Sequence, residues 1–313
     1  MRQTGTFEVV SVNLSEAKGT IKTPAGAVVL DGRGVVGDAH AGTWHRQVTL
    51  LAAERIEEFS REHGREVRPG EFAENLTTRG LDLRRVAPLD RIRVGEAELE
   101  VTQIGKACHG EQCAIFREVG RCLMPTEGIF CRVLRGGRVR AGDAGEFLPQ
   151  PLAIRAITLS DRAAAGQYAD RSGPEVRRLL EEFFAGKRWH VDVSSTVLPD
   201  DAEALASEIR AALAGGAAAV FTTGGTGVGP RDIAPETVEA LCEKTIPGIM
   251  EHIRVKFGAA KPNALLSRGV AGVAGTTQLY TLPGSVRAVG EYMGEILKTF
   301  EHVLFMLRGI DVH

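Results

Sequence analysis

The sequence predicts two domains of different class: an N-terminal β-barrel over residues 1–148 and a C-terminal three-layer α/β domain with a mostly parallel sheet over residues 152–313. The chain has 313 residues, which suits two domains of ~150 residues each. Its first half consists of short β-rich runs separated by glycine turns, whereas its second half alternates strands with helices. The proline-rich segment FLPQPLA at 147–153 separates the two patterns.

The N-terminal half is predicted to form the strands of a rolled or closed sheet. Short runs rich in β-branched residues alternate with turns, which is the pattern of a β-barrel. Only the segment 53–62 has a clearly helical pattern. The strand-forming runs are FEVVSV, GAVVL, QVTLLA, DRIRVGEAELEVTQI and IFCRVLRGGRVRAGD.

The C-terminal half has the order of a parallel α/β sheet. Its first helix opens at Ser172 with Pro174 in the first turn, and its second helix is capped near Asp200. This βαβαβ order implies parallel strands joined by right-handed crossovers. Apolar residues line one broad face of the last helix. The expected strands are 153–160, 190–198 and 218–223, and the expected helices are 172–184, 200–213 and 285–307.

The composition excludes several classes of protein. Lys plus Arg (38) nearly balances Asp plus Glu (40), and each half is balanced by itself, so neither half has the basic excess of a nucleic-acid binder. No stretch approaches the roughly 20 apolar residues of a membrane span, and the N-terminus lacks the basic-then-apolar order of a secretory signal. We therefore expect a cytoplasmic protein with no nucleic-acid or membrane partner.

A glycine-rich loop follows the third expected strand, in VFTTGGTGVGPRD at 220–232. Ligands of open parallel sheets bind at the carboxyl ends of the strands, and glycines let backbone N–H groups approach a phosphate closely. The loop has neither the Lys-Ser/Thr of a Walker A motif nor the G-x-G-x-x-G pattern, which disfavours a P-loop NTPase and a Rossmann dehydrogenase. We expect Gly224, Gly225, Thr226 and Gly227 to form a phosphate cradle.

Two aspartates stand at the ends of expected strands. Asp232 closes the glycine loop just before a helix expected to start at Pro235, and Asp200 follows the preceding strand. Carboxylates in this position can hold a Mg²⁺ that bridges nucleotide oxygens. Helix N-capping is the structural alternative, because Asp is a common N-cap, and spacing alone does not separate the two. Two further loops of the same rim, SDRAAAGQYADRSG and TLPGS, favour a phosphate-bearing ligand.

A set of ordered motifs between about 154 and 307 carries a family resemblance. The motifs SDR…G.Y.D.SGP, LPDD, TTGGTG, RD, TIPGIME, LLSR and LPGS resemble the molybdopterin adenylyltransferase family of molybdenum cofactor biosynthesis. The resemblance implies a three-layer α/β fold, usually trimeric. It also implies transfer of AMP from Mg-ATP to the terminal phosphate of molybdopterin, with release of pyrophosphate. Molybdopterin is then the substrate, with ATP and Mg²⁺ required.

The resemblance also assigns roles to individual residues. Asp200 and Asp232 become the metal-binding and catalytic carboxylates, and the glycine loop holds the nucleotide phosphates. One departure is Val286, where many members have a second proline. Two other functions stay open: a non-catalytic carrier of pterin or molybdenum species, and a nucleotide-binding regulator indifferent to pterin. The pocket is completed by Pro283, Gly284 and Ser285, and the residues expected on the pterin side are Glu251, Ser267 and Arg268.

A cysteine cluster marks the N-terminal half. Four of the five cysteines lie between 108 and 131, and in a cytosolic chain such clustering indicates thiol or metal chemistry. Cys108 stands beside Lys106 and His109, a setting that favours a thiolate. The segments GVVGDAHAGTWHRQVTLL, PGEFAENLTTRGL, TQIGKACHGEQC and CRVLRGGRVRAGD, within about 9–146, resemble a MOSC domain, a β-barrel related to part of the molybdenum cofactor sulfurases.

This second resemblance implies that Cys108 carries sulfur or ligates molybdenum through its thiolate. The domain would then handle sulfur or finished molybdenum cofactor, with other molybdenum cofactor enzymes as partners. Gly37, Asp38 and the run 74–77 look like its pocket, although Ala73 replaces the glycine often found there.

Other interpretations of the cysteines and histidines remain. Cys108, His109 and Cys113 with His40 and His45 could form a zinc site, but their spacing is not that of a structural zinc knuckle, and an iron–sulfur cluster fits less well. His40 and His45 could also bind an anionic phosphate or be turn residues. We expect the remaining cysteines to be small buried residues; these are Cys113, Cys122, Cys131 and Cys242.

Overall fold

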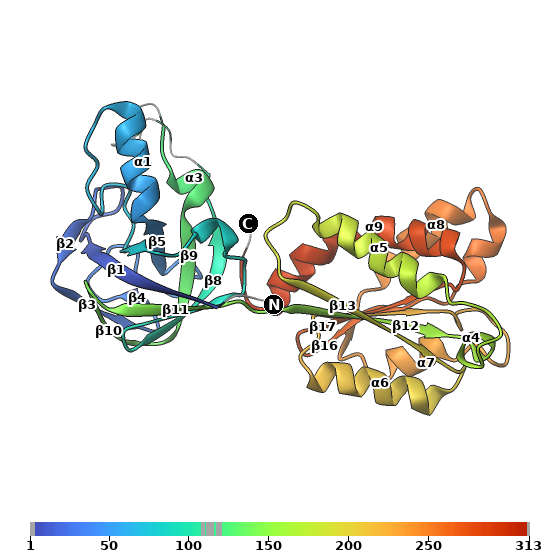
Figure 1. The fold of residues 1–313 in the computed structure, drawn as a ribbon. Helices are drawn as coiled ribbons and strands as arrows, with labels where there is room; N and C mark the ends of the chain where they lie inside the picture. The colour runs from blue at the N-terminus through green and yellow to red at the C-terminus, as the bar shows by residue number, and fades with distance from the viewer. Residues whose placement is uncertain (1–3, 108–109, 111–115, 117–120, 312–313) are drawn as a thin grey trace. The chain divides into compact units, whose positions relative to one another are not determined.

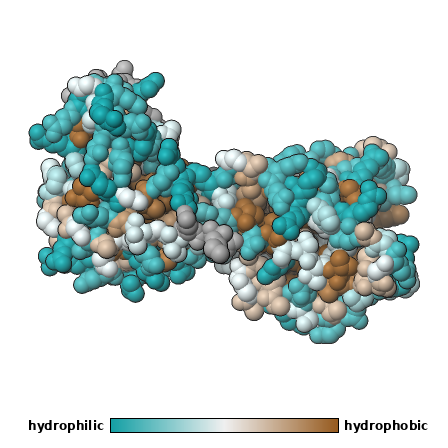
Figure 2. All heavy atoms as spheres, viewed as in Figure 1, coloured by the Kyte–Doolittle hydropathy of each residue, from teal (hydrophilic) through white to brown (hydrophobic). Residues whose placement is uncertain are grey.

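The computed structural model describes residues 4–107, 110, 116 and 121–311. The chain divides into two compact units, Met1–Gln150 and Pro151–His313 (Figure 1). No helix in the described part of the chain is both long enough and apolar enough to cross a membrane. The faces visible in Figure 2 are mostly hydrophilic, with hydrophobic residues in small separate patches.

The N-terminal unit is a closed β-barrel. Its elements are β1 (Gly5–Leu14), β2 (Thr23–Ala25), β3 (Ala27–Asp31), β4 (Gly34–Val35), β5 (Val48–Ala52), α1 (Ala53–His63), β6 (Leu76–Arg79), η1 (Leu83–Arg85), β7 (Arg91–Val94), β8 (Ala97–Ile104), α3 (Met124–Glu127), β9 (Ile129–Arg135), β10 (Gly137–Arg140) and β11 (Ala144–Leu148). An eight-stranded sheet has the order β11-β7-β8-β9-β5-β6-β1-β2, and β11 also pairs with β1. That pairing closes the ring and confirms the predicted barrel. A second sheet has the order β10-β3-β4.

Two of the predicted β-rich runs are each split into separate strands. The run 90–104 divides into β7 and β8 at Gly95, whose φ is +53°. A Cβ at Gly95 would lie 2.6 Å from the carbonyl oxygen of Arg138, so the turn needs glycine. The run 129–143 divides into β9 and β10 at Gly136. The sequence therefore located these strands but not the turns within the runs.

The C-terminal unit is a three-layer α/β domain. Its elements are β12 (Leu152–Leu159), α4 (Asp161–Ala164), α5 (Ser172–Phe184), β13 (Val191–Leu198), α6 (Ala202–Ala214), β14 (Ala219–Thr223), α7 (Ala234–Glu239), β15 (Lys244–Thr245), α8 (Pro247–Gly258), η3 (Pro262–Leu266), β16 (Ala271–Ala274), β17 (Thr277–Leu282) and α9 (Val286–Leu307). Figure 1 shows α5, α8 and α9 on one face of the sheet and α6 and α7 on the other. Each face has its own apolar core, with Phe300 in one and Ile209 in the other.

The sheet of this unit is mixed: its first three strand pairings are parallel, as predicted, and its last two are antiparallel, which the prediction did not include. Its order is β13-β12-β14-β17-β16-β15. The pairs β13–β12, β12–β14 and β14–β17 are parallel, whereas β17–β16 and β16–β15 are antiparallel. Three elements between the glycine loop and the last strand, β15, β16 and α8, were not among the expected ones.

The parallel register brings four loops to one rim. Leu159 of β12 pairs with Leu198 of β13, and Thr223 of β14 pairs with Leu282 of β17. The carboxyl ends of these strands therefore lie at the same edge of the sheet. The loops that follow them carry the motifs singled out in the sequence.

Candidate functional site

A cavity of about 620 Å³ opens at this rim. It is bounded by the loops after β12, β13, β14 and β17, so four separate parts of the chain contribute to it. The predicted residues Asp200, Asp232, Gly225, Gly284 and Ser285 all line it. The other lining residues are Thr158, Leu159, Ser160, Asp161, Arg162, Tyr168, Asp170, Arg171, Ser172, Arg231 and Val286.

Asp200 and Asp232 converge in this cavity and interact electrostatically. Burial raises the pKa of the Asp200 carboxyl above its ordinary value, and the negative charge of Asp232 raises it further. A carboxylate whose charged form is disfavoured by burial and by a neighbouring negative charge is a favourable place for a cation, because the cation offsets both effects.

Neither aspartate caps a helix, so the structural alternative is wrong for both. The N-cap of α6 is Asp201, whose carboxylate accepts a hydrogen bond of 2.7 Å from the backbone N–H of Ala204. The N-cap of α7 is Ile233. The Asp232 carboxylate accepts instead from the N–H of Gly229 at 2.8 Å, within the glycine loop.

Asp161 and Arg231 join this pair and were not among the predicted site residues. Asp161 Oδ1 accepts from the N–H of Asp200 at 2.9 Å, and Asp200 Oδ2 accepts from the N–H of Asp161 at 3.3 Å. The Arg231 guanidinium forms an ion pair with Asp161 and lies 3.5 Å from Asp200 Oδ2. The motifs SDR and GPRD contain these two residues, but nothing in their spacing shows that they meet.

The glycines of the loop are required by close approach. Gly224 has a φ of +94°, and a Cβ there would lie 2.5 Å from the carbonyl oxygen of Leu159. A Cβ on Gly227 would lie 2.7 Å from Asp232 Oδ2. Gly284 reaches the same region from the loop after β17, since its Cβ would lie 3.3 Å from the Cα of Gly224. The two glycine-containing loops thus touch one another beside the aspartates.

Arg268 holds the glycine loop from outside the cavity. Its side chain donates to the carbonyl oxygens of Gly227 at 2.6 Å and Asp232 at 2.8 Å. Its own N–H donates to the carbonyl of Thr226 at 3.0 Å, and its guanidinium pairs with Glu236. Arg268 thus contacts the glycine loop and holds its backbone in place.

The remaining predicted residues are spread around the cavity. The Ser285 hydroxyl accepts from the N–H of Ala288 at 3.3 Å and so caps α9. Pro283 is half-buried in the loop before it. Glu251 is exposed on α8, and the Ser267 hydroxyl is buried beside Tyr292. The residues that line the cavity do not include Glu251 or Ser267.

The donor set of this cavity suits Mg²⁺ better than a metal held by protein alone. Within residues 4–107, 110, 116 and 121–311, no group of three or more His, Cys, Asp or Glu side chains is arranged to hold a metal ion. Mg²⁺ commonly takes one or two carboxylates and completes its shell with water and phosphate oxygens. Asp200 and Asp232 provide two carboxylates beside a loop that can accept phosphates.

The barrel has a cavity of its own, of about 470 Å³, and its wall is basic. Lys18, Lys22, Arg46 and Lys106 line it together with His40. The aromatic part of the wall includes Trp44, Phe72 and Phe130. Such a cavity can accept an anionic ligand that also has a flat apolar part.

A buried charged network forms the floor of the basic cavity. The Lys22 ammonium pairs with Asp38, and both side chains are fully buried. Asp38 also accepts from the His40 backbone N–H at 2.9 Å and from Asn75 Nδ2 at 3.1 Å. Burial pushes the Asp38 pKa upward, but the hydrogen bonds from His40 and Lys22 outweigh burial and hold this pKa well below its usual range. Asp38 is therefore ionised, and its carboxylate oxygens are occupied by hydrogen bonds within the fold.

Glu74 and Ala73 border this network. Glu74 is fully buried, and burial raises the pKa of its carboxyl even though Oε1 accepts from the Gly70 N–H at 2.6 Å and the Thr77 hydroxyl at 2.9 Å. Ala73 has a φ of +64°, which is a glycine-type conformation. The departure seen in the sequence, alanine in place of glycine, therefore falls on a backbone position that favours glycine.

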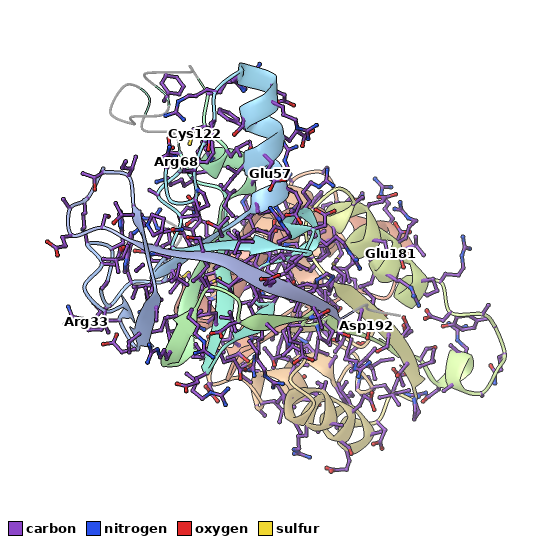
Figure 3. All side chains as sticks on the ribbon, turned by 60° about the vertical axis from the view of Figure 1, so that its left-hand side comes forward. Arg33, Glu57, Arg68, Cys122, Glu181 and Asp192 are labelled. Atoms are coloured by element: carbon purple, nitrogen blue, oxygen red, sulfur yellow. The ribbon has the colours of Figure 1, made fainter. Side chains whose placement is uncertain are left out.

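The predicted cysteine and histidine sites are only partly described. Cys108, His109 and Cys113 lie outside the described residues. Cys131 is fully buried, and Cys122 and Cys242 are half-buried. Burial raises the pKa of the Cys131 thiol far above its ordinary value. Burial also raises the pKa of the Cys242 thiol, to about 11. Cys122 lines the basic cavity and packs against the apolar cluster beneath α1 (Figure 3).

His40 and His45 have different surroundings. His40 lines the basic cavity, whereas His45 is buried and its carbonyl accepts from the Thr102 hydroxyl at 2.6 Å. The residues that line the cavity do not include His45. The two histidines therefore do not act together on a ligand of this cavity.

Two family models match the chain. Residues 155–302 match the model described as "Probable molybdopterin binding domain", and residues 37–146 match the MOSC domain. The first match contains the whole glycine loop with Asp200 and Asp232. The second contains Asp38, His40 and the segment around Cys108.

Several curated proteins resemble the C-terminal half. The molybdopterin adenylyltransferase of Haemophilus influenzae is 31% identical over 45% of this chain and 70% of its own length. Molybdenum cofactor biosynthesis protein B of Staphylococcus carnosus is 31% identical over 48% of this chain and 87% of its own. A molybdenum cofactor biosynthesis bifunctional protein of Synechococcus elongatus is 36% identical over 50% of this chain and 47% of its own. The chain spans between 22% and 51% of the larger relatives that it matches.

Proposed function

Because the chain belongs to the molybdopterin-binding family of molybdenum cofactor biosynthesis proteins and carries a MOSC domain at its N-terminus, we propose that its C-terminal domain adenylylates molybdopterin at the rim cavity. The observation that carries the proposal is the convergence of Asp200 and Asp232 beside the glycine loop. The relatives named molybdopterin adenylyltransferase support the choice of reaction.

In the proposed reaction, a terminal phosphate oxygen of molybdopterin forms a bond to the α-phosphorus of ATP. The bond from that phosphorus to its bridging oxygen breaks, and pyrophosphate leaves with the electron pair. The attacking phosphate is largely ionised at pH 7, so the protein needs no general base. What it must supply is position and positive potential.

The chain's own residues supply these needs. The glycine loop offers the backbone N–H groups of Gly225 to Gly227 to the nucleotide phosphates, whereas the N–H of Gly224 donates to the carbonyl oxygen of Leu282 at 2.9 Å. The N-terminus of α9 adds a second set of N–H groups beside Gly284. Mg²⁺, when bound, would neutralise charge on the phosphate oxygens, and Asp200 and Asp232 are the side chains that would hold it. Arg268 keeps the loop in place for both tasks.

The first experiment measures pyrophosphate release by the purified full chain with Mg²⁺, ATP and molybdopterin, and searches by chromatography for AMP-linked pterin. Asp232→Asn is expected to lower the rate by about 100-fold or more, because it removes one of the two carboxylates that would hold Mg²⁺ beside the transferred phosphate. Asp201→Asn is the matched control. Asp201 is the adjacent carboxylate of LPDD, is exposed, and only caps α6, a task that Asn also performs.

Each outcome decides between functions. Adenylylated pterin formed by the wild type and by Asp201→Asn, but not by Asp232→Asn, supports the transferase. Tight pterin binding with no pyrophosphate release supports the non-catalytic carrier instead. ATP binding that is indifferent to pterin supports a nucleotide-binding regulator.

For the N-terminal domain we propose that the basic cavity binds the molybdenum cofactor or its pterin precursor, with Cys108 handling sulfur or molybdenum. Lys18, Arg46 and Lys106, together with three aromatic rings on the cavity wall, match a flat heterocycle that bears a phosphate, whereas Lys22 is paired with Asp38. The test is equilibrium dialysis of molybdopterin against the wild type, Lys106→Gln and Cys108→Ser. We expect Lys106→Gln to weaken binding and Cys108→Ser to affect sulfur or molybdenum transfer without affecting pterin affinity. Equal pterin binding by wild type and Lys106→Gln would count against this site.

Three further properties belong to the same proposal. A homotrimer formed through the C-terminal domain, a cytoplasmic location and delivery to other molybdenum cofactor enzymes are suggested by the family resemblance. Sedimentation equilibrium of the full chain tests the trimer. A monomer at micromolar concentration would contradict it.

A further inference from the structure

We propose that Arg231 is a built-in placeholder cation, which neutralises Asp161 and Asp200 in the free protein and moves onto the substrate phosphates when a divalent cation binds. The inference rests on the proposed function, because it concerns the same metal and the same phosphates. It assigns to Arg231 a role that none of the motifs indicated.

The first observation is the position of the guanidinium. Arg231 precedes Asp232 in the glycine loop, yet its side chain reaches across the cavity to the ends of two other strands. There it pairs with Asp161 and lies 3.5 Å from Asp200 Oδ2. Asp200 is one of the two carboxylates that would hold the metal, so arginine and metal require the same oxygen atoms.

The second observation is the charge around that position. Asp161, Asp200 and Asp232 all line the cavity and face this region. The other arginines on the cavity wall are placed differently: Arg162 lies over the Tyr168 ring at 5.3 Å, and Arg171 is exposed at the start of α5. Among the described residues that line the cavity, Arg231 is thus the cation that is paired with these carboxylates.

The third observation is that Arg231 can leave. Its side chain is 65% exposed, and exposed ion pairs are weak because water screens both charges. Its loop also contains Gly227 and Gly229, next to the Asp232 carboxylate. A divalent cation can therefore displace the guanidinium, and the freed guanidinium is well suited to phosphate oxygens, which it can bind in a bidentate manner.

The displacement predicts effects of opposite sign on two ligands. Arg231→Gln removes the competitor, so the protein should bind Mn²⁺, used as the probe for the divalent site, about three- to fivefold more tightly in the absence of nucleotide. The same variant removes a phosphate ligand, so the affinity for ATP in the presence of Mg²⁺ should fall by about tenfold or more. A residue that served only the fold would not produce this pair of changes.

The experiment measures Mn²⁺ binding by electron paramagnetic resonance on the full chain without ATP or pterin, for the wild type, Arg231→Gln and Arg171→Gln. Arg171→Gln is the matched control, because it removes the same charge from the wall of the same cavity but not from the carboxylates. Its Mn²⁺ affinity should change by less than about twofold. Circular dichroism melting of all three proteins verifies that they are folded.

The outcomes separate this inference from the proposed function. Equal gains in Mn²⁺ affinity for Arg231→Gln and Arg171→Gln, or no gain for either, overturn the placeholder role, whatever the protein catalyses. A selective gain for Arg231→Gln together with no AMP transfer by the wild type supports the placeholder and overturns the transferase. Failure of the wild type and of Arg231→Gln to bind Mn²⁺ at millimolar concentration overturns both.

Discussion

The two domains place acidic side chains in opposite electrostatic surroundings. In the barrel, Asp38 is fully buried, and Lys22, His40 and Asn75 all donate to it, so its charged form is favoured. At the rim of the α/β domain, Asp200 is 21% exposed and lies near Asp232, so its charged form is disfavoured. The first carboxylate is compensated within the fold, whereas the charged form of the second would be stabilised by a bound cation. A buried carboxylate with several donors therefore serves the fold, whereas a carboxylate beside another negative charge is a candidate for ligand binding.

The chain provides a probe for each side of this comparison. Its two tryptophans are divided between the units, with Trp44 in the barrel and Trp189 in the α/β domain. Tryptophan fluorescence in a Trp189→Phe background therefore follows unfolding of the barrel. In a Trp44→Phe background it follows unfolding of the α/β domain.

The largest expected effect is on the barrel. Asp38→Asn leaves the buried Lys22 ammonium without its counter-charge, which should lower the free energy of unfolding of the barrel by about 3–5 kcal/mol. Urea unfolding in the Trp189→Phe background measures this loss. Asp31→Asn is the control, because Asp31 is exposed and its bond to the Arg33 N–H can be kept by Asn.

A double variant makes the same test more specific. Lys22→Met together with Asp38→Asn removes both charges, so it should recover part of the stability lost in the single variant. A double variant as unstable as the sum of the two single variants would show that the pair is not coupled. Asp38 would then not stabilise the barrel through Lys22.

A gain in the stability of the barrel, smaller in size than the loss expected for Asp38→Asn, is expected at Ala73. Ala73 adopts a φ of +64° in the loop before Glu74, whereas the glycine loop of the other domain has glycine at its positive-φ positions Gly224 and Gly225. Ala73→Gly should stabilise the barrel by about 0.5–1 kcal/mol. The variant removes the strain of a left-handed backbone conformation at alanine, and this gain is partly offset because glycine increases the conformational entropy of the unfolded chain.

The control for this variant is Ala144→Gly, in the extended strand β11. It should destabilise the barrel by about 0.5–1 kcal/mol, since glycine in a strand brings only the entropy cost. Both are measured by urea unfolding with Trp44 fluorescence. Loss of stability in Ala73→Gly would mean that the Cβ of Ala73, which lines the basic cavity, contributes more than the strain costs.

The smallest effect is expected at Asp200. Its pKa is raised in the folded protein by burial and then by Asp232, so its contribution to stability is greatest below the ordinary value of 3.8 and is lost as the pH rises. Asp200→Asn should therefore stabilise the α/β domain at pH 7, by up to about 0.5 kcal/mol, while weakening metal binding. The gain should vanish near pH 3. Urea unfolding in the Trp44→Phe background at both pH values measures it, and a clear loss of stability at pH 7 would place Asp200 with Asp38 among structural carboxylates.

Much of the architecture could be predicted from local patterns. The closed barrel, the βαβαβ order, α5 with its start at Ser172 and the long last helix all follow from periodicity and from cap and turn residues. The short antiparallel strands β15 and β16 escaped prediction, because runs of two and four residues carry too little periodicity to separate a strand from a loop. The hairpin turns within the longest β-rich runs escaped for a similar reason.

For the candidate site, the sequence alone determined which residue types stand at the strand ends: the glycines of the loop, Asp200 and Asp232. Those features are local, because the residues of a loop directly follow the residues of its strand in the sequence. The assignment of capping to Asp201 rather than Asp200 needed the start of α6, which only the structure shows.

Only the tertiary structure decided which of these groups meet. Parallel pairing of β12 with β13 and β14 brings Asp161, Asp200 and Arg231 to one point, although they are far apart along the chain. In the barrel, the segment before β2 and the segment after β4 bring Lys22 against Asp38, and burial there turns two ordinary charged residues into a structural pair. The physical reason is that the strength of a charge interaction depends on distance and burial, and both are set by the tertiary arrangement of strands and loops rather than by the order of residues.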